Sequence, residues 1–189
     1  MANKKQLVIL ASGAGTNVRA ICEHFKDHRR IEVAAIFSNK ENAGALQVAI
    51  DYGIHAESFT KDYWEKGFVH IAIESFEPEL IILAGFLLKV PKAMVEFYPR
   101  SIVNIHPALL PKYGGKGMYG MHVHRAVHES NEAESGITIH YVNEHYDEGS
   151  IIAQHKVAID GNDRPEDIAR KVQALEHEYF ARSLARILN

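Results

Sequence analysis

The chain has 189 residues, 47% of them hydrophobic, and a formal net charge of −3 from 21 basic and 24 acidic side chains. This length suits one domain with a substantial core, and the nearly balanced charge gives no electrostatic basis for binding nucleic acid or an anionic membrane surface. With a single cysteine, Cys22, no apolar run long enough to span a membrane and no linker, we expect a cytoplasmic protein that forms one domain over residues 1–189.

The first half of the chain alternates short apolar runs with helical patterns. Residues 7–11 form a continuous apolar run that breaks at Ser12 and Gly13, which is typical of a buried parallel strand. A helix is predicted from Asn17. The same signs predict strands over residues 33–37, 80–84 and 102–105 and a helix over residues 45–49. This alternation predicts an α/β fold with an open, mostly parallel twisted sheet flanked by helices.

The second half of the chain has a different pattern. Residues 136–142 and 151–157 flank an acidic connection that contains glycine, which predicts a hairpin pairing antiparallel near the C-terminal end of the sheet. From Asp163 onward, Pro165 stands in a first helical turn, and apolar residues follow at helical spacing. This stretch predicts one long closing helix.

A glycine loop joins the first predicted strand to the first predicted helix and consists of Ser12, Gly13, Ala14, Gly15, Thr16 and Asn17. Backbone N–H groups in such a loop, together with the positive end of the helix dipole, suit a phosphate group. The loop is not a P-loop, because no Lys-Ser/Thr pair follows, and Val18 replaces the third glycine of the dinucleotide fingerprint. A phosphate-bearing small molecule is one interpretation, and a turn that only lets strand and helix pack is the other.

Asn104 and His106 stand at the end of a predicted strand. Alternate side chains of a strand point the same way, so both should project into one cleft. An amide can donate to a developing oxyanion and an imidazole can move a proton, which is the chemistry of acyl transfer. A carboxylate from Asp147 would favour the imidazolium and fix its orientation. The alternative is a polar strand end satisfied within an ordinary turn.

Five segments in this order carry a resemblance to a known family: the glycine loop and residues 37–40, 83–86, 104–113 and 147–149. With them the chain resembles the folate-dependent formyltransferase family, and within it the phosphoribosylglycinamide formyltransferases. The resemblance implies transfer of a formyl group from 10-formyltetrahydrofolate to the amine of glycinamide ribonucleotide in purine biosynthesis. It implies these two small molecules as partners, no metal, and a monomer or homodimer.

The resemblance also implies roles for individual residues. Asn104 would steady the tetrahedral oxyanion, His106 would act on the proton or the oxyanion, and Asp147 would keep His106 charged. The nucleotide would be bound by Gly13, Ala14, Gly15, Thr16, Asn17 and, on its ribose side, Glu176. The folate would be bound by Lys61, Phe86, Leu87, Leu88, Lys89, Val90, Asn104, Asn143, Glu144, His145, Tyr146 and Asp147. The alternative for residues 86–90 is ordinary core at a strand end.

Three rival functions are weighed against this one. Formyltetrahydrofolate deformylase uses the same trio on water but usually carries a further domain ahead of the glycine loop. Methionyl-tRNA formyltransferase would need a further C-terminal domain and a basic surface. A non-catalytic nucleotide-binding module would bind its ligand tightly without turnover.

Residues 114–121 form a glycine-rich insertion that relatives of this family replace with a shorter link before a His-x-His pair, here His122 and His124. An insertion of this composition can form a mobile lid. The histidines of this region do not predict a metal site, because no cysteine joins them and no His-Glu-x-x-His pattern is present. His122 or His124 is expected to help shape the nucleotide site instead.

Overall fold

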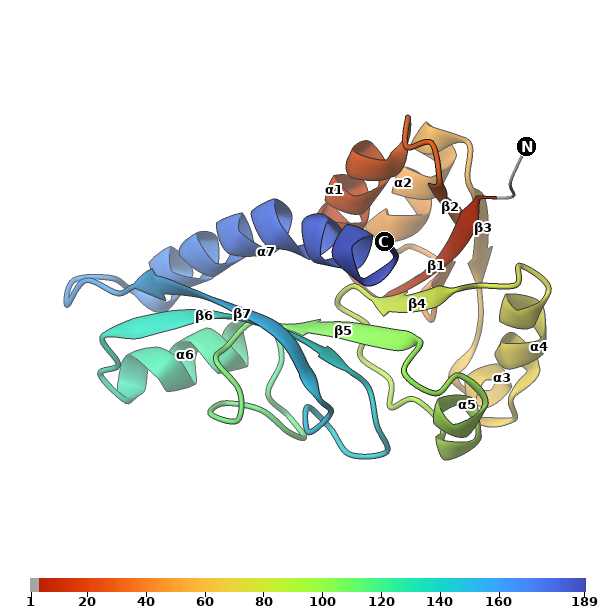
Figure 1. Cartoon of the computed structure of the whole chain (residues 1–189). Coiled ribbons are helices and arrows are strands. Elements are labelled where there is room, and N and C mark those ends of the chain that lie inside the picture. The colour runs from red at the N-terminus through yellow and green to blue at the C-terminus, as the bar shows by residue number, and fades with distance from the viewer. Residues whose placement is uncertain (1–3) are drawn as a thin grey trace.

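The computed structural model describes residues 4–189, and its strands form one sheet flanked by helices (Figure 1). The strands are β1 (Lys5–Ala11), β2 (Ile31–Ser38), β3 (His55–Ser58), β4 (Leu80–Leu83), β5 (Ile102–His106), β6 (Glu134–Tyr141) and β7 (Ile151–Ala158). The helices are α1 (Thr16–Phe25), α2 (Gly44–Tyr52), α3 (Lys61–Glu65), α4 (Phe68–Glu74), α5 (Lys92–Phe97), α6 (Met121–Glu129) and α7 (Pro165–Ile187). No helix within residues 4–189 combines the length and the apolar character needed to cross a membrane.

The strand order is β3-β2-β1-β4-β5-β6-β7. Strands β1 to β5 pair in parallel, whereas β6 runs antiparallel to β5 and β7 antiparallel to β6. The predicted open α/β sheet, its antiparallel C-terminal hairpin and the long closing helix are therefore confirmed.

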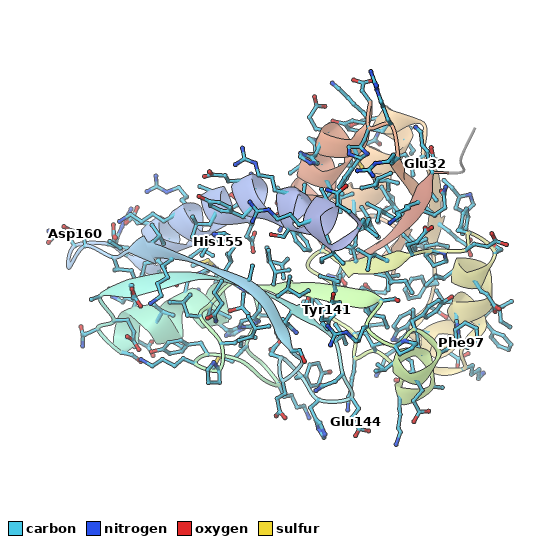
Figure 2. The ribbon with its side chains drawn as sticks, viewed as in Figure 1. Glu32, Phe97, Tyr141, Glu144, His155 and Asp160 are labelled. Atoms are coloured by element: carbon cyan, nitrogen blue, oxygen red, sulfur yellow. The ribbon has the colours of Figure 1, made fainter. Side chains whose placement is uncertain are left out.

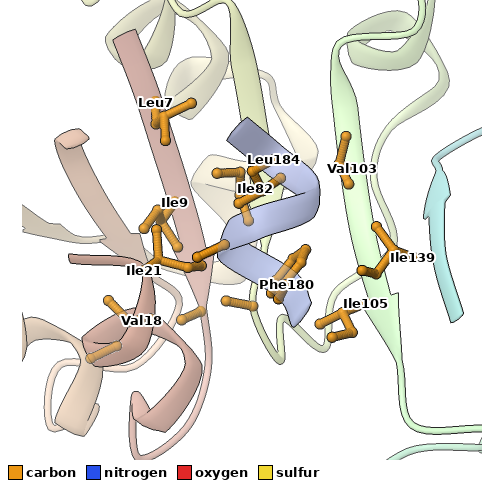
Figure 3. Close-up of a cluster of buried hydrophobic side chains, with 14 of the residues drawn as sticks. Leu7, Ile9, Val18, Ile21, Ile82, Val103, Ile105, Ile139, Phe180 and Leu184 are labelled. Atoms are coloured by element: carbon orange, nitrogen blue, oxygen red, sulfur yellow. The ribbon is translucent and has the colours of Figure 1, made fainter. Parts of the chain in front are cut away.

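Two apolar clusters cover the two faces of the sheet. Alternate residues of β1 point into different clusters, with Leu7 and Ile9 on one face and Val8 and Leu10 on the other. The first cluster includes residues of α1, α2, α6 and α7, and Phe180 of α7 packs in it beside the strands (Figure 3). The second cluster includes residues of α3, α4 and α5. Burial on both faces explains why the central strands are continuous apolar runs in the sequence.

The elements β3, α3, α4, α5 and α6 have no clear pattern in the sequence. Every residue of β3 is exposed, so this strand has no apolar run. The helices α3, α4 and α5 have only five to seven residues, too few to show a helical period. Helix α6 has nine residues, and three of them are histidines.

Candidate active site

A cavity of about 750 Å³ lies where β4 and β5 end, and residues of α6, α7 and the loop after β6 complete its lining. Because β1, β4 and β5 are parallel and adjacent, their carboxyl ends lie at one edge of the sheet, the usual place for a ligand cleft in such folds. Asn104, His106 and Asp147 all line this cavity. The structure thus brings together the three residues that the sequence predicts to be catalytic.

Asn104 is held by His140, the residue directly opposite it on β6. The Nδ2 atom of Asn104 lies 3.1 Å from His140 Nε2, and His140 Nδ1 lies 2.9 Å from the carbonyl oxygen of Tyr141. The roles of the ring nitrogens depend on the tautomer, and in the tautomer with its proton on Nδ1, bonded to this carbonyl, Nε2 accepts one N–H of the Asn104 amide. The second N–H of that amide remains available to a ligand in the cavity.

His106 and Asp147 form a buried pair in the same cavity. His106 Nδ1 lies 3.5 Å from Asp147 Oδ2, and the two side chains are 4% and 11% exposed. His106 Nε2 lies 2.7 Å from the carbonyl oxygen of Tyr113, which fixes the ring from its other side. Asp147 Oδ2 also accepts a hydrogen bond from the backbone N–H of Gly115, at 2.9 Å. Both ring nitrogens of His106 therefore face protein groups.

Asp147 lies beside the carboxyl end of β5, although its loop starts beside the opposite end of that strand. Because β6 is antiparallel to β5, the loop after β6 starts level with the beginning of β5, where Val103 pairs with Tyr141. The carboxylate nevertheless lies beside His106, and its Oδ1 atom is 3.7 Å from His140 Nε2. The loop must therefore turn back toward the cavity.

Burial and charge act in opposite directions on the pKa values of this pair. Burial lowers the pKa of His106 below its usual value, and this effect outweighs the nearby carboxylate of Asp147, which raises it. Asp147 thus favours the charged form of His106, and burial opposes it. The role of Asp147 in keeping His106 charged stays a prediction. Burial opposes the ionisation of Asp147, but His140, His106 and the Gly115 N–H together hold its pKa below the ordinary value.

The glycine loop brings Asn17 to one end of the cavity. Asn17 Nδ2 donates to Glu176 Oε2 of α7 at 2.9 Å, and both residues line the cavity. Burial raises the pKa of Glu176, although the Asn17 hydrogen bond partly offsets this. Asn17 Oδ1 is buried and has no hydrogen-bond partner within residues 4–189. An orphaned acceptor beside a carboxyl group fits a ligand that carries hydroxyl groups.

The remaining part of the predicted phosphate loop is arranged tightly against α2. Gly15 precedes α1 with a φ of 80°, and a Cβ atom there would lie 2.7 Å from Ala45 Cα. Thr16 Oγ1 lies 3.3 Å from Nε2 of Gln173, a residue of α7 that also lines the cavity. The cavity lining does not include Gly13, Ala14, Gly15 or Thr16, so the loop adjoins it and only Asn17 enters it.

The predicted folate residues divide into two groups. Residues 86–90 line the cavity together with Asn143, His145 and Tyr146, and Lys89 Nζ lies 5.8 Å from the centre of the Tyr146 ring. Lys61 and Glu144 are not in the lining. Lys61 is paired with Glu65 in α3, and Glu144 projects from the loop after β6 (Figure 2).

Sequence reasoning missed several groups of the site, namely His140, Gln173 and the backbone of residues 113–115. Only the alternation of His140 within a strand could have suggested that it faces the cavity, and nothing in the sequence reveals its register against Asn104. His124 is 6% exposed and lines the cavity, and its Nδ1 atom has no hydrogen-bond partner within residues 4–189. In the same residues no group of three or more His, Cys, Asp and Glu side chains is placed to hold a metal ion.

Residues 5–184 match the formyl transferase family. The chain belongs to this family. Family membership implies a folate co-substrate. Its relatives include the phosphoribosylglycinamide formyltransferase of Escherichia coli (strain K12), which is 34% identical over 92% of this chain and 82% of the relative.

Other similar proteins carry the same kind of name. The chloroplastic phosphoribosylglycinamide formyltransferase of Arabidopsis thaliana is 38% identical over 97% of this chain, which spans 65% of the length of that relative. Among solved structures, the glycinamide ribonucleotide transformylase 1 of Geobacillus kaustophilus superposes with a TM-score of 0.90 at 27% identity, covering 99% of this chain and 100% of that one. The formyl transferase fold therefore extends over nearly the whole chain.

Proposed function

We propose that this formyl transferase moves a formyl group from 10-formyltetrahydrofolate to the amine of glycinamide ribonucleotide, a step of de novo purine (IMP) biosynthesis. The observation that carries the proposal is the convergence of Asn104, His106 and Asp147 in one cavity that also reaches Asn17 and Glu176. This arrangement supports a single cleft in which the proposed acyl-transfer residues and the proposed ribose contacts of the nucleotide lie together. The names of the relatives agree with this activity.

In the proposed reaction the substrate amine attacks the formyl carbon, and the bond from that carbon to the folate nitrogen then breaks. The amine loses a proton and the folate nitrogen gains one, so the proton balance closes. Asn104 donates its second amide N–H to the oxyanion of the tetrahedral intermediate. Asp147 is ionised and accepts the proton directly or stabilises it on His106, whose ring lies 3.5 Å away.

The two substrates are proposed to occupy different parts of the cavity. We propose that the nucleotide phosphate binds to Gly13, Ala14, Gly15, Thr16 and Asn17, and that its ribose contacts Glu176. We propose that the folate lies against residues 86–90 and the loop of residues 143–147, because polar backbone groups beside apolar side chains suit a pterin ring. Lys61 would act only as an outer contact for the glutamate tail of the folate.

The proposal requires these two small molecules and no metal, nucleic acid or membrane surface. We also propose a single formyltransferase domain over residues 1–189, a cytoplasmic location, and a monomer or homodimer. The buried free thiol of Cys22 agrees with a reducing compartment. The insertion of residues 114–121 is proposed to close over the bound substrates, because residues 115–121 line the cavity.

The test incubates the pure protein with glycinamide ribonucleotide and 10-formyltetrahydrofolate, with a parallel reaction that lacks the amine. Formylated nucleotide that forms only in the complete reaction supports the transferase. Equal release of formate without the amine would instead indicate a deformylase, and tight binding without turnover a nucleotide-binding module. Asn104→Ala is expected to lower turnover by about a hundredfold or more, as loss of an oxyanion donor does. The matched variant Asn162→Ala, in an exposed turn before α7, is expected to retain the native rate.

A further inference from the structure

The backbone of residues 113–115 contacts both members of the His106–Asp147 pair. The Tyr113 carbonyl oxygen lies 2.7 Å from His106 Nε2, and the Gly115 N–H donates to Asp147 Oδ2 at 2.9 Å. The same carboxylate oxygen lies 3.5 Å from His106 Nδ1. These contacts close a ring, because each side chain of the pair touches the other and also touches the same three-residue segment. We call residues 113–115 the backbone bracket.

The last two positions of the bracket favour glycine for different reasons, namely little room at Gly114 and a left-handed backbone at Gly115. A Cβ atom on Gly114 would lie 2.5 Å from Leu110 Cδ2 and 3.2 Å from Asp147 Cβ, and Leu110 is itself buried. Gly115 has a φ of 97°, a conformation that other residues rarely adopt. Tyr113 and Asp147 are also left-handed, with φ values of 57° and 58°. Left-handed residues other than glycine persist where surrounding contacts hold them, often at functional sites.

The bracket is also fixed from outside the cavity. The Tyr113 hydroxyl donates to Glu132 Oε1 at 2.8 Å, and Lys112 Nζ lies 2.7 Å from the same oxygen. Glu132 shortly precedes β6, the strand that carries His140. The bracket is therefore anchored to the part of the chain that also orients Asn104.

We propose that residues 113–115 are positioning residues for formyl transfer. The Tyr113 carbonyl orients the His106 ring, the Gly115 N–H holds the Asp147 carboxylate, and Gly114 leaves the room that this close approach requires. The catalytic role inferred here rests on the proposed function. The hydrogen bond from the Gly115 N–H to Asp147 can be tested without an activity assay. The start of the glycine-rich insertion thus belongs to the proposed catalytic apparatus. Neither glycine touches substrate through a side chain, and both act through Asp147.

The first test is an NMR titration of the ¹⁵N-labelled protein. The Gly115 amide resonance is expected to move as Asp147 is protonated in acid, and to lose this movement in Asp147→Asn. The ring signals of His106 and His140, which also face the carboxylate, are followed in the same titration, so that an amide shift that tracks a ring is not assigned to Asp147. Identical titration of the Gly115 amide in both proteins would overturn the proposal.

The second test compares two substitutions of glycine by alanine. Gly114→Ala is expected to lower kcat by up to about a hundredfold while leaving the KM for the nucleotide within about twofold, because it displaces the carboxylate. Gly161→Ala is the matched control, since Gly161 has open space around it and no positive φ. If the substitution breaks the Gly115 hydrogen bond, the pKa of Asp147 rises. The fall of kcat in acid, which we call the acid limb, then moves to higher pH.

Native kcat and an unmoved acid limb in folded Gly114→Ala would overturn the proposal, as would an equal loss in Gly161→Ala. If Gly114→Ala does not fold, the NMR titration decides alone. Failure of the proposed function gives a different result, namely a native protein without formylated product whose Gly115 amide still reports the ionisation of Asp147.

Discussion

Replacing Asp147 by asparagine removes the charge of the catalytic pair while nearly preserving its shape. At an effective dielectric constant of about 20, unit charges 3.5 Å apart attract by about 5 kcal/mol, so the carboxylate can contribute up to this amount when His106 gains a proton. An asparagine amide keeps part of this interaction as a dipole. We therefore expect a net loss of roughly 2–3 kcal/mol, or about 30-fold to 150-fold in kcat.

The assay measures kcat and KM for the wild type and Asp147→Asn from pH 9 down to the lowest pH at which both proteins stay folded, alongside direct measurement of nucleotide affinity. Wild-type activity should fall in acid as Asp147 is protonated, and its lowered pKa places this fall below the ordinary range of a carboxyl group. The variant should lack this limb and keep nucleotide affinity within about threefold, because the side-chain contacts of Asp147 are with His106, His140 and Gly115 and not with Asn17 or Glu176. The control Asp62→Asn, an exposed residue of α3 paired with Lys66, should behave as wild type. A variant with a near-native rate and an unchanged pH profile would refute the assignment of Asp147.

Three further predictions concern the frame of the site. Gly15→Ala forces a Cβ atom to within 2.7 Å of Ala45 Cα, so nucleotide affinity measured by calorimetry should fall at least tenfold, and native affinity would contradict the placement of the phosphate. Thr138→Val removes a buried hydroxyl with three hydrogen bonds and should lower the free energy of unfolding by about 1–3 kcal/mol in urea, whereas no loss would mean that its partners find others. Burial lowers the pKa values of His106 and His124, so below about pH 6.5 the unfolded chain binds protons that the folded chain does not. The free energy of unfolding should therefore decrease as the pH is lowered from about 7.5 to about 5.5. His124→Leu should reduce this fall, and a fall equal to that of wild type would show that His124 does not contribute.

The sequence predicts the parts of the fold whose pattern reflects burial on both faces. The strands β1, β4 and β5 are recognisable as apolar runs because helices cover each side of the sheet. Strand β3 is not recognisable, because its residues are exposed and only its backbone pairing with β2 defines it. Helices of five to seven residues were likewise missed, since their side chains complete too few turns to reveal a buried stripe.

The same distinction applies to the candidate site. Asn104 and His106 could be grouped from the sequence because strand alternation is local, whereas the contact of Asn104 with His140 depends on the register between two strands. The Tyr113 carbonyl and the Gly115 N–H could not be predicted, because every residue but proline carries these groups and only tertiary structure selects which of them meet a side chain. The lowered pKa of His106 was missed for a related reason, since the sequence shows the partner charge but not the extent of burial.

The chain reverses direction between β5 and β6, and the segment that connects these two strands can vary in length. Asn104 and His140 are fixed by sheet pairing on either side of that reversal, so the stretch between them can lengthen or shorten without moving either one. Insertions after the bracket can therefore change the wall over the substrates without moving Asn104 or His140. Residues 116–121 occupy this part of the connection, and engineered loops that alter substrate preference are best introduced there.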